Sequence, residues 1–155
     1  MWIGLGANLG ERADTLRLAI GAIDAISETR VQRVSSLYRS TPVDAGGPDY
    51  LNAVAELSTT LAPQALLQAL QAIELAAGRQ RPYRNAPRTL DLDIVDWADA
   101  TIDTATLTVP HPRLWQRAFV LRPLAELVPQ RVPASALQAV QTQAIERYAA
   151  PGWQI

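Results

Sequence analysis

The sequence has no lysine and no cysteine, and it contains one histidine among its 155 residues. Without lysine, the chain cannot use a P-loop lysine to hold phosphates or a lysine to form a Schiff base. Without cysteine, it has no thiol nucleophile, no zinc–cysteine site and no disulfide bond, which fits a reducing compartment. The single histidine, His111, excludes a histidine-rich metal site. Carboxylates, arginines, amides and aromatic rings are left to carry any chemistry.

The chain also has little net charge and lacks long apolar runs. Its formal net charge is -1, so there is no overall attraction to nucleic acid or to an anionic membrane. We therefore expect neither as a partner, and we interpret a local basic segment as a site. With 48% hydrophobic residues and no signal-peptide or membrane-span pattern, we expect one cytoplasmic domain over residues 1–155.

What the sequence does contain is a regular succession of apolar patterns. These predict strands over residues 2–6, 30–39, 50–60 and 90–94, and helices over 11–26 and 63–77. The order β-α-β-β-α-β is that of α+β, ferredoxin-like domains, in which two helices cover one face of an antiparallel sheet. An extended segment ending at Pro110 and helical patterns over 114–127 and 133–148 predict a C-terminal helical appendage.

Two acids stand at alternate positions of the last predicted strand. Asp91 and Asp93 point to one strand face, where like charges repel unless a cation neutralises them. Magnesium is typically held by one or two carboxylates together with substrate phosphates. The preceding loop supplies guanidinium groups that match phosphate geometry: Arg79, Arg81, Arg84 and Arg88. The segment predicts a magnesium–nucleotide site, although a solvated edge strand beside a basic surface loop explains these residues equally well.

A second candidate site follows a loop rich in glycine and proline. Tyr50 and Asn52 are two positions apart, so on a strand an aromatic ring and a side-chain amide face the same way. That pair suits a flat polar heterocycle, and an ordinary core tyrosine is the alternative. His111 lies between two prolines and is expected at a surface, where it could contact phosphate or be structural.

Six segments share their order and residue types with one known family. They are Gly6-Ala7-Asn8-Leu9-Gly10, Tyr38-Arg39-Ser40-Thr41-Pro42, Pro48-Asp49-Tyr50-Leu51-Asn52-Ala53, Ile73-Glu74 with Gly78-Arg79, Pro87-Arg88-Thr89-Leu90-Asp91-Leu92-Asp93-Ile94, and Val109-Pro110-His111-Pro112-Arg113 leading to Arg117-Ala118-Phe119. Over nearly its whole length the chain resembles the 6-hydroxymethyl-7,8-dihydropterin pyrophosphokinase family. The resemblance implies a ferredoxin-like fold and transfer of diphosphate from ATP to a pterin alcohol, with release of AMP, in folate biosynthesis.

The resemblance also implies a role for individual residues. Asp91 and Asp93 would hold two magnesium ions on the ATP phosphates, and Arg79 and Arg88 would act in the transition state. The pterin would contact Ser40, Pro42, Val43, Tyr50, Asn52 and Phe119. ATP would contact Leu67, Gln71, Glu74, Arg81, Arg88, Ile94, Thr108, His111 and Arg117. The implied partners are ATP and the pterin alone, bound by a monomer.

Three alternatives compete with this interpretation. One is a binding or regulatory module of the same fold that has lost turnover. A second is RNA binding, but the sequence lacks the Lys/Arg-Gly-Phe-rich strand motif of ferredoxin-like RNA binders. A third is dinucleotide binding through Gly4, Gly6 and Gly10, but the third glycine comes one residue late for that motif. The acid pair together with the arginines favours the enzyme.

Overall fold

An antiparallel sheet forms the centre of the computed structural model, which describes residues 1–8, 10–42, 47–78 and 89–155. The strand order is β5-β1-β4-β3-β8, and β2 pairs with a different part of β4. The strands on this sheet are β1 (Trp2–Ala7), β2 (Thr29–Val34), β3 (Leu37–Ser40), β4 (Tyr50–Thr59), β5 (Asp91–Asp96) and β8 (Ile145–Ala149). All the pairings are antiparallel, which confirms the predicted ferredoxin-like α+β fold.

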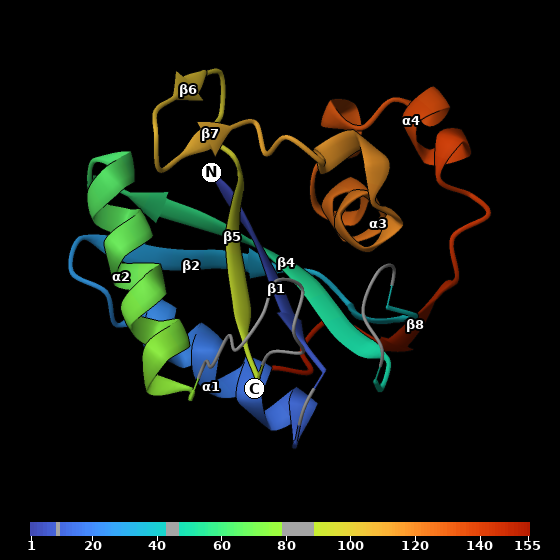
Figure 1. Ribbon diagram of the computed structural model, residues 1–155, viewed down its shortest axis with the longest axis horizontal. Helices are drawn as coiled ribbons and strands as arrows, with labels where there is room; N and C mark the ends of the chain where they lie inside the picture. Colours follow the sequence, from blue (N-terminus) through green and yellow to red (C-terminus); the bar gives the residue numbers. More distant parts are fainter. Residues whose placement is uncertain (9, 43–46, 79–88) are drawn as a thin grey trace.

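Two helices cover one face of this sheet (Figure 1). They are α1 (Arg12–Asp24) and α2 (Pro63–Ala76). Pro63 suits the first turn of α2 because its missing N–H would have no helical partner there. Gly78 follows α2 with a φ of 83°, a left-handed conformation that glycine adopts without strain. The buried cluster between helices and sheet includes Ile3, Leu5, Leu16, Ile23, Leu66 and Leu70.

Residues 30–39 form two strands rather than the single one predicted. Ser35 and Ser36 lie between β2 and β3, and both are fully buried. The Ser35 hydroxyl donates to the carbonyl oxygen of Ser36 at 2.8 Å and accepts the N–H of Val54 at 3.0 Å. Serine hydroxyls that bond to nearby backbone compete with regular strand pairing, which accounts for the break.

Residues 114–140 pack on the opposite face of the sheet (Figure 1). Here η1 (Leu114–Gln116) and α3 (Ala118–Leu127) confirm the helical pattern predicted over 114–127. Their apolar side chains meet those of β1, β4 and β5 in a second buried cluster that includes Trp2, Val54, Val95, Leu114, Leu121 and Leu124. The part of the sheet that α3 covers is therefore buried on both of its faces.

The helix predicted over 133–148 is wrong beyond residue 139. α4 is short, Ala134–Ala139, and the chain then forms β8, which pairs with β3. Without β8, β3 would be a sheet edge with unpaired N–H and C=O groups. Pairing with this distant strand overrides the helical periodicity of the local sequence.

Between β5 and α3 the chain forms a small two-stranded sheet. β6 (Ile102–Asp103) pairs antiparallel with β7 (Thr108–Val109), so the extended segment predicted before Pro110 is present. Val109 is buried in the cluster under α1 and α2, and β7 contacts β5. Within the described ranges, no helix is long and apolar enough to cross a membrane.

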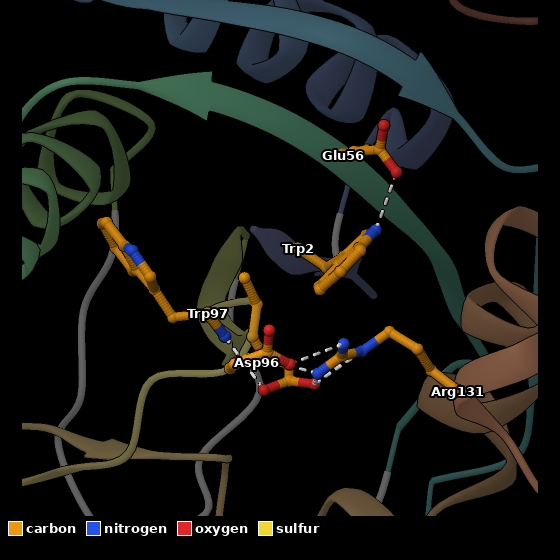
Figure 2. A network of polar contacts seen from close by, with 7 residues as sticks. Trp2, Glu56, Asp96, Trp97 and Arg131 are labelled. Carbon is orange, nitrogen blue, oxygen red and sulfur yellow. Dashed lines mark hydrogen bonds and ion pairs between the residues drawn. The ribbon is translucent and has the colours of Figure 1, made fainter.

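A polar network fixes the segment after α3 to the C-terminal end of β5 (Figure 2). Arg131, in η2 (Pro129–Arg131), donates through Nη2 to Asp96 Oδ2 at 2.7 Å. Its guanidinium lies 4.7 Å from the centroid of the Trp2 ring. The indole N–H of Trp2 donates in turn to Glu56 at 3.0 Å. Strands β1, β4 and β5 therefore meet the C-terminal segment at this end of the sheet.

Candidate active site

One row of the sheet brings together residues from four strands. Gly6 of β1 lies directly between Asp91 of β5 and Asn52 of β4. On its other side, Asn52 is paired with Tyr38 of β3. Directly opposed residues of antiparallel strands point to the same face. Val54, two positions from Asn52, packs in the cluster with α3, so this is the α3 face of the sheet.

The adjacent row repeats the pattern one step along the strands. Gly4 lies between Asp93 of β5 and Val54 of β4. Asp91 and Asp93 therefore share the α3 face, and both are half-buried. The central strand places no side chain between the two carboxylates and β4.

The glycine at position 6 allows side chains of β4 to lie over β1. A Cβ atom there would be 3.1 Å from Asn52 Nδ2 and 3.6 Å from Tyr50 Cδ1. Tyr50 and Asn52, the predicted heterocycle-binding pair, therefore both approach the strand that separates them from Asp91. A Cβ atom on Gly4 would meet Val95 Cγ2 at 3.4 Å, which is an ordinary contact.

A hydrogen bond orients the amide of Asn52. Its Oδ1 accepts the hydroxyl of Ser40 at 2.6 Å, and both residues are buried. The Nδ2 group, with its two donors, is then the part of the amide that approaches Gly6. Tyr50 is half-buried, whereas the core tyrosine Tyr38 is only 3% exposed, so Tyr50 is not enclosed as an ordinary core tyrosine would be. Pro42, also half-buried, follows Ser40 by two residues.

His111 lies close to the acidic face of β5. Its backbone N–H donates to the carbonyl oxygen of Val95 at 2.8 Å. Burial lowers the pKa of the imidazole, the positive charge of Arg117 lowers it further, and the negative charge of Asp91 acts in the opposite direction. Nδ1 accepts the backbone N–H of Arg113 at 3.1 Å, so the neutral ring carries its proton on Nε2. The imidazole can therefore donate one hydrogen bond without being charged.

The start of α3 carries the other predicted aromatic ring. Phe119 is half-buried, and the guanidinium of Arg117 lies 5.3 Å from the centroid of its ring. Because the charges of Arg117 and Asp91 both act on His111, this end of α3 is near the acidic face. The structure thus brings the predicted ring and two predicted phosphate contacts to the same region as the acids.

Five of the predicted ATP contacts lie on β5 or on two elements that contact it. Both α2 and β7 contact this edge strand, and the residues on the three elements are Leu67, Gln71, Glu74, Ile94 and Thr108. Glu74 is only 2% exposed, and its Oε2 accepts the backbone N–H of Leu92 at 2.8 Å. That bond satisfies a donor that no neighbouring strand takes. Glu74 therefore supports β5 from below the predicted site.

The arginine loop and one loop residue lie outside the described residues. These are Arg79, Arg81, Arg84 and Arg88, together with Val43. Their contacts stay predictions.

The acid pair fits a magnesium ion that is shared with phosphates. Among the described residues, no group of three or more His, Cys, Asp or Glu could hold a metal ion. Magnesium needs no such cage, because it is usually bound by one or two carboxylates and completes its shell with phosphate oxygens and water. Two carboxylates on one face, opposite two glycines, supply hard oxygen ligands.

Comparison with known proteins places the chain in a family. The family model described as 7,8-dihydro-6-hydroxymethylpterin-pyrophosphokinase (HPPK) matches residues 2–129. The chain belongs to the HPPK family. The matched range runs from β1 through α3, so it contains all the predicted site residues.

Individual HPPK relatives are similar over most of their length. A 2-amino-4-hydroxy-6-hydroxymethyldihydropteridine pyrophosphokinase from Pseudomonas aeruginosa is 47% identical over 135 residues, which is 86% of this chain and 83% of that protein. The enzyme of that name from Bacillus subtilis is 43% identical over 132 residues, 83% of this chain and 78% of that protein. A crystal structure of HPPK-DHPS in complex with substrates has a TM-score of 0.66 at 13% identity, so it supports the fold. This chain is covered over 87% of its length and spans 41% of that chain.

One carboxylate next to the candidate site of this HPPK family member, that of Glu126, was not predicted from the sequence. Glu126 of α3 accepts hydrogen bonds from Ser36 and Tyr38, which belong to the β2–β3 segment. The available signal was its spacing of seven residues from Phe119, which puts both side chains on one helix face.

Proposed function

We propose that this chain transfers a diphosphate group from ATP to the hydroxymethyl group of 6-hydroxymethyl-7,8-dihydropterin and releases AMP, a step in folate biosynthesis. The observation that carries the proposal is the row Asp91–Gly6–Asn52, in which a carboxylate and a buried amide share one sheet face across a glycine. Carboxylates suit metal-bound phosphates, and the amide with the Tyr50 ring suits a flat polar heterocycle. The name of the relatives, a pterin pyrophosphokinase, joins these two ligands in one reaction.

The pterin is proposed to bind at the β4 side of this row. Nδ2 of Asn52 would donate to its polar edge, an arrangement supported by the bond from Ser40 that fixes the amide. Tyr50 and Phe119 would enclose its two faces, because both rings are half-buried and come from opposite sides, the sheet and α3. The loop residues Pro42 and Val43 would complete the pocket.

ATP is proposed to bind at the β5 side. Its base would lie along the outer edge of β5, among Leu67, Gln71, Ile94 and Thr108, and Glu74 would brace that strand through the Leu92 N–H. Its phosphates would extend onto the α3 face, where His111 and Arg117 are close to Asp91. The loop arginine Arg81 is proposed as a further phosphate contact.

The chemistry is in-line displacement at phosphorus. The hydroxymethyl oxygen forms a bond to the β-phosphorus, the bond from that phosphorus to the α-phosphate oxygen breaks, and the hydroxyl proton is released. Such transfers depend on alignment and charge stabilisation. Magnesium, proposed as two ions on Asp91 and Asp93, would neutralise phosphate charge and help to activate the hydroxyl. Arg79 and Arg88 would stabilise the charge that develops in the transition state.

The test is AMP formation from ATP that depends on added pterin alcohol. We expect AMP and the pterin diphosphate in equal amounts, both identified by mass, and no AMP when either the pterin or magnesium is omitted. Formation of ADP would show transfer of a single phosphate and would contradict the proposal.

Measurement of AMP formation together with ligand binding separates the competing classes of protein. A binding module would bind ATP or the pterin in calorimetry without producing AMP. A nucleic-acid-binding protein would bind RNA with an affinity that falls steeply with salt. A protein that binds both proposed substrates and produces no AMP with magnesium present would overturn the proposed activity and leave the pocket assignment standing.

A further inference from the structure

Glu126 is held by one short stretch of the sheet. Its Oε1 accepts the backbone N–H of Ser36 at 2.8 Å and the Ser36 hydroxyl at 2.9 Å, and its Oε2 accepts the hydroxyl of Tyr38 at 2.6 Å. Arg147 of β8 is also near, with Nη2 at 3.7 Å from Oε2. One carboxylate on α3 is thus bonded to the β2–β3 break and to β3.

The charge states of this group are mutually consistent. Burial alone would raise the pKa of Glu126, but the hydrogen bonds from Tyr38 and Ser36 outweigh it and hold the pKa below its usual value. Burial first, and then the bond to Glu126, raises the pKa of Tyr38. At neutral pH, an ionised carboxylate therefore accepts a bond from a protonated phenol, and bonds to a charged group are the stronger kind.

Tyr38 connects this carboxylate to the pterin side of the site. It is paired directly with Asn52 across β3 and β4, so the two residues share the α3 face. Asn52 in turn bonds to Ser40, two positions from Tyr38 on the same strand. A change in the position of β3 would therefore move both Tyr38 and the hydroxyl that orients the Asn52 amide.

A second residue on the same face of α3, Arg122, also contacts Tyr38. Phe119, Arg122 and Glu126 are separated by three and four residues, which places them in a row on α3. The guanidinium of Arg122 lies 5.7 Å from the centroid of the Tyr38 ring. The Tyr38 side chain of β3 therefore contacts both Arg122 and Glu126, which lie in the same row as Phe119.

We propose that Glu126 is a positioning residue for the pterin, which acts by locking α3 onto β3 and so sets Phe119 and the Asn52 amide at a fixed separation. This inference depends on the proposed function. It assigns a part in substrate binding to a side chain that does not touch the substrate. Because most of the proposed ATP contacts lie on β5, α2 and β7, on the far side of Asn52 from Tyr38, the effect on the pterin should exceed the effect on ATP.

The experiment compares Glu126→Gln and Tyr38→Phe with the wild-type protein, with KM for each substrate and kcat measured by AMP release. Glu126→Gln keeps the shape and removes the charge, and Tyr38→Phe keeps the ring and removes the donor. Each is expected to raise KM for the pterin about tenfold, the scale of one lost bond to a charged group, and to change KM for ATP less than about twofold. The double variant should lose less than the sum of the two single variants, because both changes weaken the same charge-assisted bond.

Two control variants separate positioning from general stability. Glu146→Gln makes the same chemical change on β8, where Glu146 forms an exposed ion pair with Arg39 of β3. The KM values for both substrates should stay unchanged. Ile23→Val thins the core under α1, on the opposite face, and should lower the melting temperature without altering the ratio of the two KM values. Rescue of the melting temperature of Glu126→Gln by added salt or osmolyte should leave its pterin KM raised.

Several results would overturn the inference. Equal changes in both KM values, or a lower melting temperature with an unchanged pterin KM, would show that Glu126 only stabilises the fold. Additive effects in the double variant would break the link through Tyr38. Absence of pterin-dependent AMP formation in the wild-type protein would instead overturn the proposed function, and this inference with it.

Discussion

The two ends of β5 use the same residue type in opposite ways. At the C-terminal end, Asp96 is buried, lies opposite Trp2 of β1 and accepts two hydrogen bonds from Arg131. At the other end, Asp91 and Asp93 are half-buried and lie opposite two glycines. One strand and one neighbour therefore create two different environments for a carboxylate.

The difference teaches how to tell a structural acid from a ligand-binding one. At Asp96 the protein itself provides a guanidinium, with an indole ring stacked against it, so the charge is neutralised when the chain folds (Figure 2). At the glycine end two like charges stand on one face, and a bound cation would relieve their repulsion. The first arrangement stabilises the fold and the second favours a ligand.

The largest effect is expected for Asp93→Ala. Loss of a metal ligand should lower kcat by about a thousandfold, equivalent to roughly 4 kcal/mol of transition-state stabilisation. The melting temperature should change little, because Asp93 is half-buried and its removal also relieves repulsion from Asp91. Activity and thermal unfolding are measured on the same preparation. Near-normal turnover with magnesium would show that the acid pair is not the metal site.

The next largest effect is expected for the loop arginines. Arg88→Ala and Arg79→Ala should each slow the chemical step about a hundredfold, or roughly 3 kcal/mol, by analogy with other preorganised donors to a developing charge. The affinity for ATP should fall much less, because these groups are proposed to engage fully in the transition state. Single-turnover rates at saturating substrates measure the first quantity and equilibrium titration the second. Weaker ATP binding with an unchanged rate would make these arginines simple anchors.

Asp96 provides the opposite case. Asp96→Ala leaves the partly buried Arg131 with the exposed carboxylate of Asp99 at 3.8 Å and should cost about 2 kcal/mol of unfolding free energy, less than a fully buried pair because Arg131 remains 29% exposed. At a temperature where the variant is folded, kcat should match that of the wild-type protein. Urea unfolding and AMP release give the two numbers. A large loss of kcat in a folded variant would erase the contrast between the two ends of β5.

The sequence predicted the geometry of Asp91 and Asp93 at the start of β5 better than the contacts of Asp96 at its end. Alternation places Asp91 and Asp93 on one face whatever the rest of the fold does, so that inference needed only local geometry. The role of Asp96 depends on Arg131, 35 residues away, and no local pattern pairs the two. Likewise, Glu126 and Ser36 are 90 residues apart, and their contact exists only after α3 has packed on the sheet.

Local patterns also explain where the fold prediction succeeded and failed. The helices over 11–26 and 63–77 were predicted because their apolar stripes fit one face, and the structure confirms both within a few residues at each end. β8 was missed because its pairing with β3 is a tertiary event that overrides a weak helical pattern. The break at Ser35 was missed because it depends on a hydroxyl bond to Val54 on another strand.

The smallest effect is expected from adding one methyl group to the glycine row. In Gly6→Ala, the new Cβ atom would lie 3.1 Å from Asn52 Nδ2, and the amide cannot yield easily because Ser40 holds its other end. Displacement of the amide should cost about 1 kcal/mol and raise KM for the pterin roughly fivefold, with KM for ATP unchanged. Gly4→Ala is the matched control in the same strand, since its Cβ atom would meet only Val95 at 3.4 Å. Both variants remove a glycine from β1 and gain similarly in chain entropy, so their difference isolates the contact with Asn52. Steady-state kinetics of the two variants provide the measurement, and equal pterin KM values would mean that the amide at the centre of the row does not bind the substrate.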